Sequence, residues 1–133
     1  MEEMMEKRVW QRVRGEADPV ERVRSVLAEQ GRVLGAYRAL SRRGGAWRRL
    51  LEQKEEQIAC LRGLMRAMTG QGAACPKSGT GPVDLMQCLD SERRLLEELT
   101  ELGREGKWAP VLDLLRDRQK CQCRLLLELM GSM

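Results

Sequence analysis

The residues of this chain that could carry chemistry are six polar or reactive side chains that interrupt apolar stripes at helical spacing. Four segments have apolar residues recurring every three or four positions, as expected for helices with one buried face. Each stripe is broken near its middle: the first and third by one residue, the second and fourth by two residues three positions apart. These residues are Gln30, Lys54, Gln57, Glu92, Arg118 and Cys121.

If these side chains are buried together, their charges can balance without a metal ion. We predict that Glu92 pairs with Arg118, Lys54 or both, with Gln30 and Gln57 completing the hydrogen bonds. Buried charges persist when they are paired and hydrogen-bonded, and the loss of one partner costs about 3–5 kcal/mol. The sequence therefore predicts a buried polar cluster that matters for stability.

Two alternatives stay open for this cluster. In the fourth segment, Gln119 with Gln122 fits almost as well as Arg118 with Cys121. A Lys or Arg at the edge of a stripe can also extend its charged end into water, and a glutamine there can be exposed. We interpret Tyr37 as a core residue whose hydroxyl reaches a polar neighbour.

The composition excludes several kinds of active site. The chain of 133 residues has no histidine, which removes Ser-His-Asp and Cys-His catalysis and the HExxH zinc site. We therefore expect no cofactor and favour a non-enzymatic role. Its five cysteines are an odd number without an export signal, which favours reduced thiols in the cytoplasm. We interpret Cys60, Cys88 and Cys121 as small core residues.

Charge and hydropathy indicate neither a nucleic-acid nor a membrane partner. The 24 Lys and Arg are interleaved with 20 Asp and Glu, for a net charge of +4, which is typical of solvated helix faces. Nucleic-acid binding favours a one-sided basic stripe, and none is evident. No run approaches the roughly 20 apolar residues of a membrane span.

Pro and Gly residues mark where the predicted helices begin and end. Asp18-Pro19 is a strong helix start, and Gly44-Gly45 a stop. Residues 1–17 are predicted as an amphipathic arm or helix, and residues 18–133 as a four-helix bundle. The predicted helices are about 19–42, 46–68, 82–104 and 109–130, with a loop at 70–82.

The two halves of the predicted bundle look alike. Each has a long helix, a Gly-containing turn, a Trp (Trp47 or Trp108) and a second helix that opens on a Leu-Leu pair. Short connections make antiparallel helical hairpins, and two hairpins joined by a longer crossover make an antiparallel four-helix bundle. The expected fold class is therefore all-α.

The chain resembles the ferritin-like family, specifically its small rubrerythrin-like members. The resemblance rests on the run AYRAL at 36–40, the ending LMRAMTG at 64–70 and the duplicated hairpins, and covers about residues 18–130. In this family two helices supply one Glu each and the other two supply a Glu-x-x-His pair, all directed inward. The resemblance implies a related bundle, but both Glu-x-x-His pairs are absent here.

Matched position by position, the resemblance implies that the diiron site has been lost. Gln30 stands where a ligand Glu is expected, and Lys54 with Gln57 replaces the first Glu-x-x-His. Arg118 with Cys121 replaces the second pair. Glu92 alone keeps the chemistry of a ligand.

Three functions follow as hypotheses. The first is a metal-free relative with a structural or protein-interaction role. The second is a metal-binding or redox protein that uses Glu92, Cys121 and nearby Glu55 or Glu56. The third is a helical binding protein unrelated to ferritins, similar to export chaperones.

Self-association is a further expectation. The first helix carries a second apolar stripe of Val26, Val33 and Leu40, which a four-helix core need not use entirely. A homodimer would bury it.

Overall fold

The computed structural model describes residues 18–77, 83–104 and 106–132, and these residues form helices and connections without a strand. The predicted all-α class is confirmed for this part of the chain, whereas the predicted arm at 1–17 lies outside it. The four α-helices are α2 (Pro19–Leu40), α3 (Ala46–Thr69), α4 (Leu85–Leu102) and α5 (Ala109–Gly131), and a 3-10 turn, Ser41–Arg43, follows α2.

Side-chain caps explain where two of the helices begin. Asp18 accepts a hydrogen bond from the amide of Val20 at 3.2 Å, with Pro19 in the first turn of α2. Asp84 accepts one from the amide of Gln87 at 3.1 Å. Because Asp84 occupies the cap position, α4 begins three residues later than the predicted start at 82.

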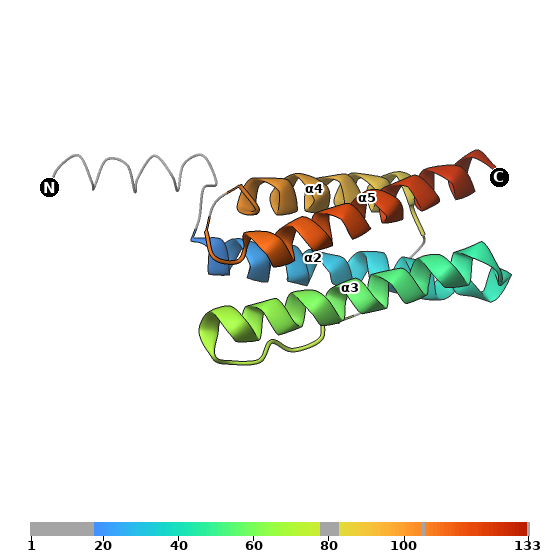
Figure 1. Ribbon diagram of the computed structural model, residues 1–133. Helices are drawn as coiled ribbons and strands as arrows, with labels where there is room; N and C mark the ends of the chain where they lie inside the picture. The colour runs from blue at the N-terminus through green and yellow to red at the C-terminus, as the bar shows by residue number, and fades with distance from the viewer. Residues whose placement is uncertain (1–17, 78–82, 105, 133) are drawn as a thin grey trace, which may run out of the picture.

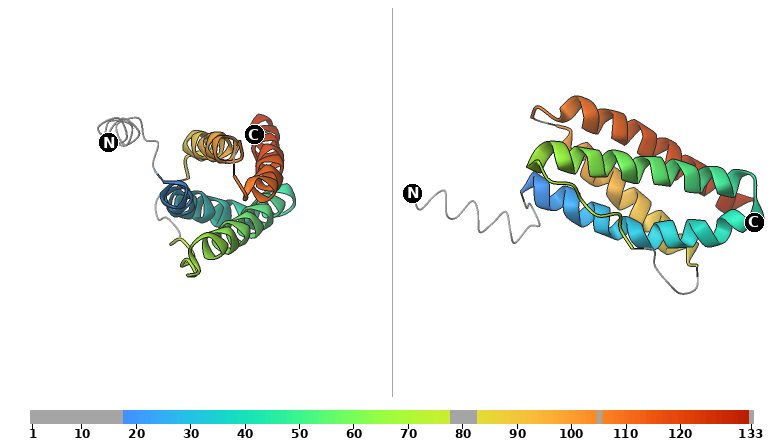
Figure 2. Two further views of the ribbon diagram at one scale, coloured as in Figure 1. Left: turned by 60° about the vertical axis from the view of Figure 1, so that its left-hand side comes forward. Right: turned by 90° about the horizontal axis from the view of Figure 1, so that it is seen from below.

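The helices pack as two hairpins, with α2 against α3 and α4 against α5 (Figure 1). In this view α2 and α5 run from left to right, and α3 and α4 run back. Additional contacts join α2 to α4 and α3 to α5, so each helix has two neighbours around a common core (Figure 2). The end of α3 and the start of α2 lie at the same end of the bundle, whereas α4 starts at the opposite end (Figure 1). The chain therefore runs back along the bundle between α3 and α4.

The described part of this return connection, residues 70–77, packs closely against α2 and α3. Arg62 donates a hydrogen bond to the carbonyl of Ala73 at 2.8 Å. A methyl group at Gly31 in α2 would overlap the carbonyl oxygen of Lys77. Glycine at position 31 therefore permits the close approach of the connection.

The core consists of two apolar clusters separated by a polar layer. One cluster lies toward the start of α2 and is built on Leu27, Leu61 and Leu99. The other lies toward the end of α2 and is built on Tyr37, Leu50 and Leu126. Seven buried polar side chains occupy the sequence positions between the two clusters. Ser91 on α4 is 7% exposed, and the other six are exposed by 3% or less and come from all four helices. We call these six the polar layer: Gln30, Lys54, Gln57, Glu92, Gln119 and Gln122.

The buried face of α5 differs from the predicted one by one residue. The face predicted from Arg118 and Cys121 also carries Val111 and Leu114, but these two are 42% and 55% exposed, whereas Leu112 and Leu115 are buried. Both stripes have helical spacing, so apolar periodicity does not separate them. The face of α5 that is buried has neutral amides at its centre. The predicted face would have buried the guanidinium of Arg118, which costs more free energy than burying an amide.

The second apolar stripe of α2 is part of the core. Val26, Val33 and Leu40 are 8%, 0% and 5% exposed within the single chain. These residues therefore leave no exposed stripe on α2, which contacts both α3 and α4, and the homodimer itself stays a prediction.

None of the helices that the structure describes has an apolar stretch long enough to cross a membrane.

Candidate functional site: a buried polar layer

The centre of the polar layer is the ammonium group of Lys54, which is fully buried. Its Nζ donates to Oε1 of Gln30 at 2.6 Å, to Oε1 of Gln57 at 3.0 Å and to Oε1 of Glu92 at 2.5 Å. A protonated lysine has three N–H donors and no acceptor. All three donors are used, so the cation has a complete set of partners from three helices.

Glu92, on α4, is the anionic partner and is also fully buried. Its Oε1 accepts from Lys54 and from Nε2 of Gln119 at 3.2 Å, and its Oε2 accepts from the hydroxyl of Tyr37 at 3.1 Å. Side chains of α2, α3 and α5 thus converge on one carboxylate of α4. The layer therefore connects all four helices.

The chemistry of the partners fixes the orientation of the four amide side chains. Gln30 and Gln57 must present oxygen to Lys54, because an ammonium group only donates. Gln119 and Gln122 must present nitrogen, because the carbonyl oxygens of Glu92 and Leu50 only accept, at 2.8 and 3.0 Å.

Each of these amides keeps one polar atom without a hydrogen-bond partner among the described residues. These atoms are Nε2 of Gln30, Nε2 of Gln57, Oε1 of Gln119 and Oε1 of Gln122. A buried polar atom that lacks a partner costs about 1–3 kcal/mol. The layer therefore keeps two amide NH₂ groups and two amide oxygens unpaired, all of them shielded from solvent.

The neighbouring acids are held in their neutral forms. Burial, and secondly the charge of Glu92, raises the pKa of the Tyr37 hydroxyl far above its usual range. The same two causes, in the same order, raise the pKa values of the Cys88 and Cys123 thiols to about 11. Tyr37 is therefore a hydrogen-bond donor, and neither thiol is a nucleophile at neutral pH.

Four of the six predicted cluster residues meet in the layer, and two do not. Gln30, Lys54, Gln57 and Glu92 are buried, with exposed fractions of 3% or less. Arg118 and Cys121 are exposed on α5. Their predicted places are occupied by Gln119 and Gln122, so the prediction of Arg118 and Cys121 as cluster residues is wrong. The reason is the one given for the buried face of α5: neutral amides are buried at lower cost than the guanidinium of Arg118.

Of the predictions for the cysteines and Tyr37, some are confirmed and some are wrong. Cys88 is buried as predicted, whereas Cys60 and Cys121 are exposed and are not core residues. Tyr37 is fully buried and its hydroxyl reaches Glu92. The bonds from Gln119 and Gln122 to backbone carbonyls had no signal in the sequence, because they depend on how α5 is set against its neighbours.

The donor set does not form a metal site. Among the described residues no group of three or more Cys, Asp or Glu side chains could hold an ion. Glu92 is inside the layer and bonded to a cation, whereas Cys121 is exposed. The structure therefore does not bring Glu92 and Cys121 together, and the metal-binding function stays a prediction.

The layer also has no access for a substrate, because both charged groups are fully buried. What the arrangement does chemically is hold an ion pair and align four helices. Near one side of it, α3 and α5 border a cavity of about 310 Å³ that includes Gln57 and Gln122 in its lining.

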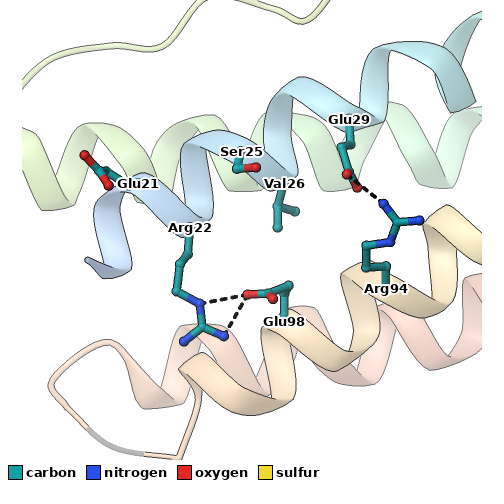
Figure 3. A pocket seen from close by; sticks show the side chains of 7 residues that line it. All are labelled: Glu21, Arg22, Ser25, Val26, Glu29, Arg94 and Glu98. Carbon is teal, nitrogen blue, oxygen red and sulfur yellow. Dashed lines mark hydrogen bonds and ion pairs between the residues drawn. The ribbon is translucent and has the colours of Figure 1, made fainter. Parts of the chain in front are cut away.

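A second set of charges joins α2 and α4 at the surface (Figure 3). Arg22 pairs with Glu98 at 2.8 Å, and Glu29 pairs with Arg94 at 2.9 Å. The later residue of α2 meets the earlier residue of α4, so these two helices run in opposite directions along this contact.

No protein-family model, curated protein or solved structure matches this chain.

Proposed function

We propose that this chain is a metal-free protein of the ferritin-like type, in which an internal ion pair stands in place of a metal centre, and that it serves a structural or protein-interaction role. The observation that carries the proposal is the surrounding of Lys54 Nζ by three oxygen atoms from three helices. A metal site in such a bundle also gathers side-chain oxygens from facing helices around a cation. Here the cation is part of the chain.

The distribution of the polar layer supports the family relationship. Counting the six residues of the layer, and thus not Ser91, the four helices contribute one, two, one and two residues, with Lys54 and Gln57, and Gln119 and Gln122, each three positions apart. This is the spacing of the ligands in ferritin-like carboxylate bundles. The two hairpins and the long return connection of Figure 1 fit an antiparallel arrangement of that type.

An interaction role is supported by apolar side chains that α5 leaves at the surface. Val111, Leu114 and Leu127 are 42%, 55% and 45% exposed. All five cysteines have free thiols, which fits the predicted reducing cytoplasm. The buried layer supplies no accessible acid, base or nucleophile, which supports a role other than catalysis.

The replacement of a metal by Lys54 can be tested with Lys54→Glu and the matched control Lys54→Gln. Lys54→Glu places two carboxylates side by side, which destabilises the fold unless a cation joins them. We expect Mn²⁺ to raise its melting temperature, since a ligand at 100 times its Kd stabilises a protein by about 2.7 kcal/mol. We expect no response from Lys54→Gln or the wild type.

Metal analysis of the purified wild-type chain completes this test. After incubation with Fe²⁺ or Mn²⁺ and desalting, we expect less than about 0.1 metal ion per chain, because Lys54 already neutralises Glu92. Stoichiometric iron or manganese in the wild type would contradict the proposal. So would a Mn²⁺ response of Lys54→Glu no greater than that of Lys54→Gln.

A further inference from the structure

Helix α5 carries a second stripe at helical spacing that the described residues leave uncovered. Val111, Leu114, Arg118, Cys121 and Leu125 follow one another at alternating intervals of three and four positions. The first four are exposed, with Val111 at 42% and Leu114 at 55%, and Leu125 is partly buried. Alternating intervals of three and four are the spacing by which one helix packs along another.

Helix α3 lies beside α5 and borders this stripe with a row of the same spacing (Figure 2). Arg118 and Cys121 line one cavity with residues of α3, and Nη1 of Arg118 lies 3.9 Å from Sγ of Cys60. A Cβ atom added at Gly63 would meet no atom within 4 Å, so the row is open there. We call the stripe and the row together the α3–α5 face; the row consists of Gln53, Glu56, Cys60, Gly63 and Ala67.

The charged residues at this face lack full partners within the chain. Glu56 and Arg124 form no ion pair with the residues that the structure describes, and the one hydrogen bond of Arg118 is the long contact with the Cys60 thiol. Asp117 pairs only with its neighbour Arg116, at 3.4 Å on the surface. The face therefore combines exposed apolar side chains with charges that a partner can neutralise.

Asp117 and Arg124 flank the stripe on one side of α5 and have opposite charges. They are seven residues apart, which is two turns or about 10 Å along a helix, too far for an ion pair within one chain. Two copies of α5 that run antiparallel can bring Asp117 of each copy to Arg124 of the other. A two-fold contact forms such a pair twice.

The same antiparallel pairing matches the other residues of the stripe. With Asp117 facing Arg124, Leu114 of one copy packs on Leu125 of the other, and Arg118 lies next to Cys121. Because Glu56 borders the same cavity as Cys121, Arg118 of the second copy also reaches the side of Glu56. Apolar and charged groups are thus complementary in one register.

We propose that the α3–α5 face binds a second copy of this chain, in a two-fold dimer whose α5 helices run antiparallel. This surface replaces the stripe of α2 for which a homodimer was predicted, since that stripe is buried. The inference rests on the interaction role proposed above, for which it names the partner, and not on the replacement of a metal by Lys54. The dimer is measured by mass and the replacement by the response to metal, so either can fail alone.

Sedimentation equilibrium of the full chain tests the dimer. A reducing agent is present throughout, because it removes any dimer linked through the exposed cysteines. Between about 5 and 200 µM we expect the mass to rise from one chain to two, with a Kd of about 10–100 µM.

Two exposed leucines of α5 provide matched variants. Leu114 is 55% exposed in the stripe, and Leu127 is 45% exposed and lies about 140° around the helix from it. Leu114→Glu should weaken the dimer at least about tenfold, whereas Leu127→Glu should leave its Kd unchanged. Circular dichroism of both variants should match the wild type, which separates loss of the dimer from loss of folding.

A charge exchange tests the register. Asp117→Arg or Arg124→Asp alone sets like charges opposite each other in both halves of the dimer and should weaken it at least about threefold at low salt. The double variant Asp117→Arg/Arg124→Asp should restore the wild-type Kd, because the pairs form again with their signs reversed.

A wild type that stays monomeric up to about 200 µM would overturn the proposal. If Leu114→Glu then lowered the melting temperature more than Leu127→Glu, the face would be assigned to residues 1–17 of the same chain; equal melting temperatures would assign it to another protein. A dimer that Leu114→Glu leaves intact, or a charge exchange that does not restore it, would likewise contradict this interface.

Discussion

Two regions of this molecule use the same pairing of carboxylate and cation under opposite conditions. Lys54 and Glu92 meet at 2.5 Å in the interior, where both side chains are fully buried. Arg22 and Glu98 meet at 2.8 Å on the surface between α2 and α4, where the side chains are 17% and 32% exposed (Figure 3).

The difference shows that burial, rather than distance, decides what an ion pair contributes. Exposed pairs are worth about 0–1 kcal/mol because water solvates each charge almost as well as its partner does. A buried ion pair adds little stability compared with apolar side chains of similar size. Removing one partner, however, leaves an unpaired buried charge, which strongly destabilises the fold. The interior pair therefore constrains which helices can meet and in which register, while the surface pairs adjust stability slightly.

The largest expected effect comes from removing one buried partner. Lys54→Met and Glu92→Leu should each lower the free energy of unfolding by about 3–5 kcal/mol, because each leaves a buried charge without its counter-ion. Denaturant unfolding monitored by circular dichroism measures the change.

The double variant Lys54→Met/Glu92→Leu is the control for this prediction. It should be much less destabilised than the sum of the single variants, since it leaves neither charge behind. Additive losses would show that the pair is not coupled and would remove the contrast with the surface.

The next effect is the loss of a neutral donor to the buried carboxylate. Tyr37→Phe removes the hydroxyl that donates to Glu92 at 3.1 Å and should cost about 1.5–3 kcal/mol, as for hydrogen bonds to charged groups. Thermal unfolding of the variant beside the wild type checks it. A cost below about 0.5 kcal/mol would mean that Glu92 is satisfied without Tyr37.

The interior should also show a dependence on alkaline pH that the surface pairs lack. The pKa values of Cys88 and Cys123 are about 11 in the folded chain, against an ordinary value of 9.0. The folded state therefore keeps protons that the unfolded state loses, so stability is present below pH 9 and falls as the pH rises to about 11. The expected slope is at most about 1.4 kcal/mol per pH unit for each proton.

Unfolding measured between pH 8 and about pH 11 tests this dependence. The variant Cys88→Ala/Cys123→Ala should show a shallower fall than the wild type, with Tyr37 accounting for what remains above its ordinary pKa of 10.0. Identical slopes in the two proteins would contradict the assignment to these thiols.

The smallest effects belong to the surface. Arg22→Ala or Glu98→Ala should cost about 0.2–1 kcal/mol, and the cost should shrink as NaCl is raised because exposed charges are screened. The cost of Lys54→Met should respond much less to salt. A comparable salt dependence of both would contradict the difference in burial.

Arg118→Leu provides the sharpest test of the register of α5. The sequence-based cluster made Arg118 a buried partner of Glu92, whose loss would be costly. On the exposed face where it lies, the substitution should change stability by less than about 0.5 kcal/mol.

Much of the fold was predictable from local signals. The Asp18-Pro19 start and the predicted loop from residue 70 rest on local chemistry, and the observed helices begin and end within three residues of the predicted bounds. The polar positions on α2, α3 and α4 were also predictable, because the side chains that interrupt their apolar stripes are buried as expected. On α5, two faces have equivalent spacing, and periodicity alone favoured the wrong one.

The sequence by itself determined the helices, the absence of histidine chemistry and the presence of a lysine and a glutamate at the centre of apolar stripes. These are local properties of residue type and spacing. Only the tertiary structure decided that Lys54 meets three oxygens, that Gln119 and Gln122 enter instead of Arg118 and Cys121, and that Val26, Val33 and Leu40 are core. The physical reason is that burial is settled between helices: a neutral amide can be buried against a carbonyl at lower cost than an unpaired guanidinium, and that choice appears only when the neighbouring helix is in place.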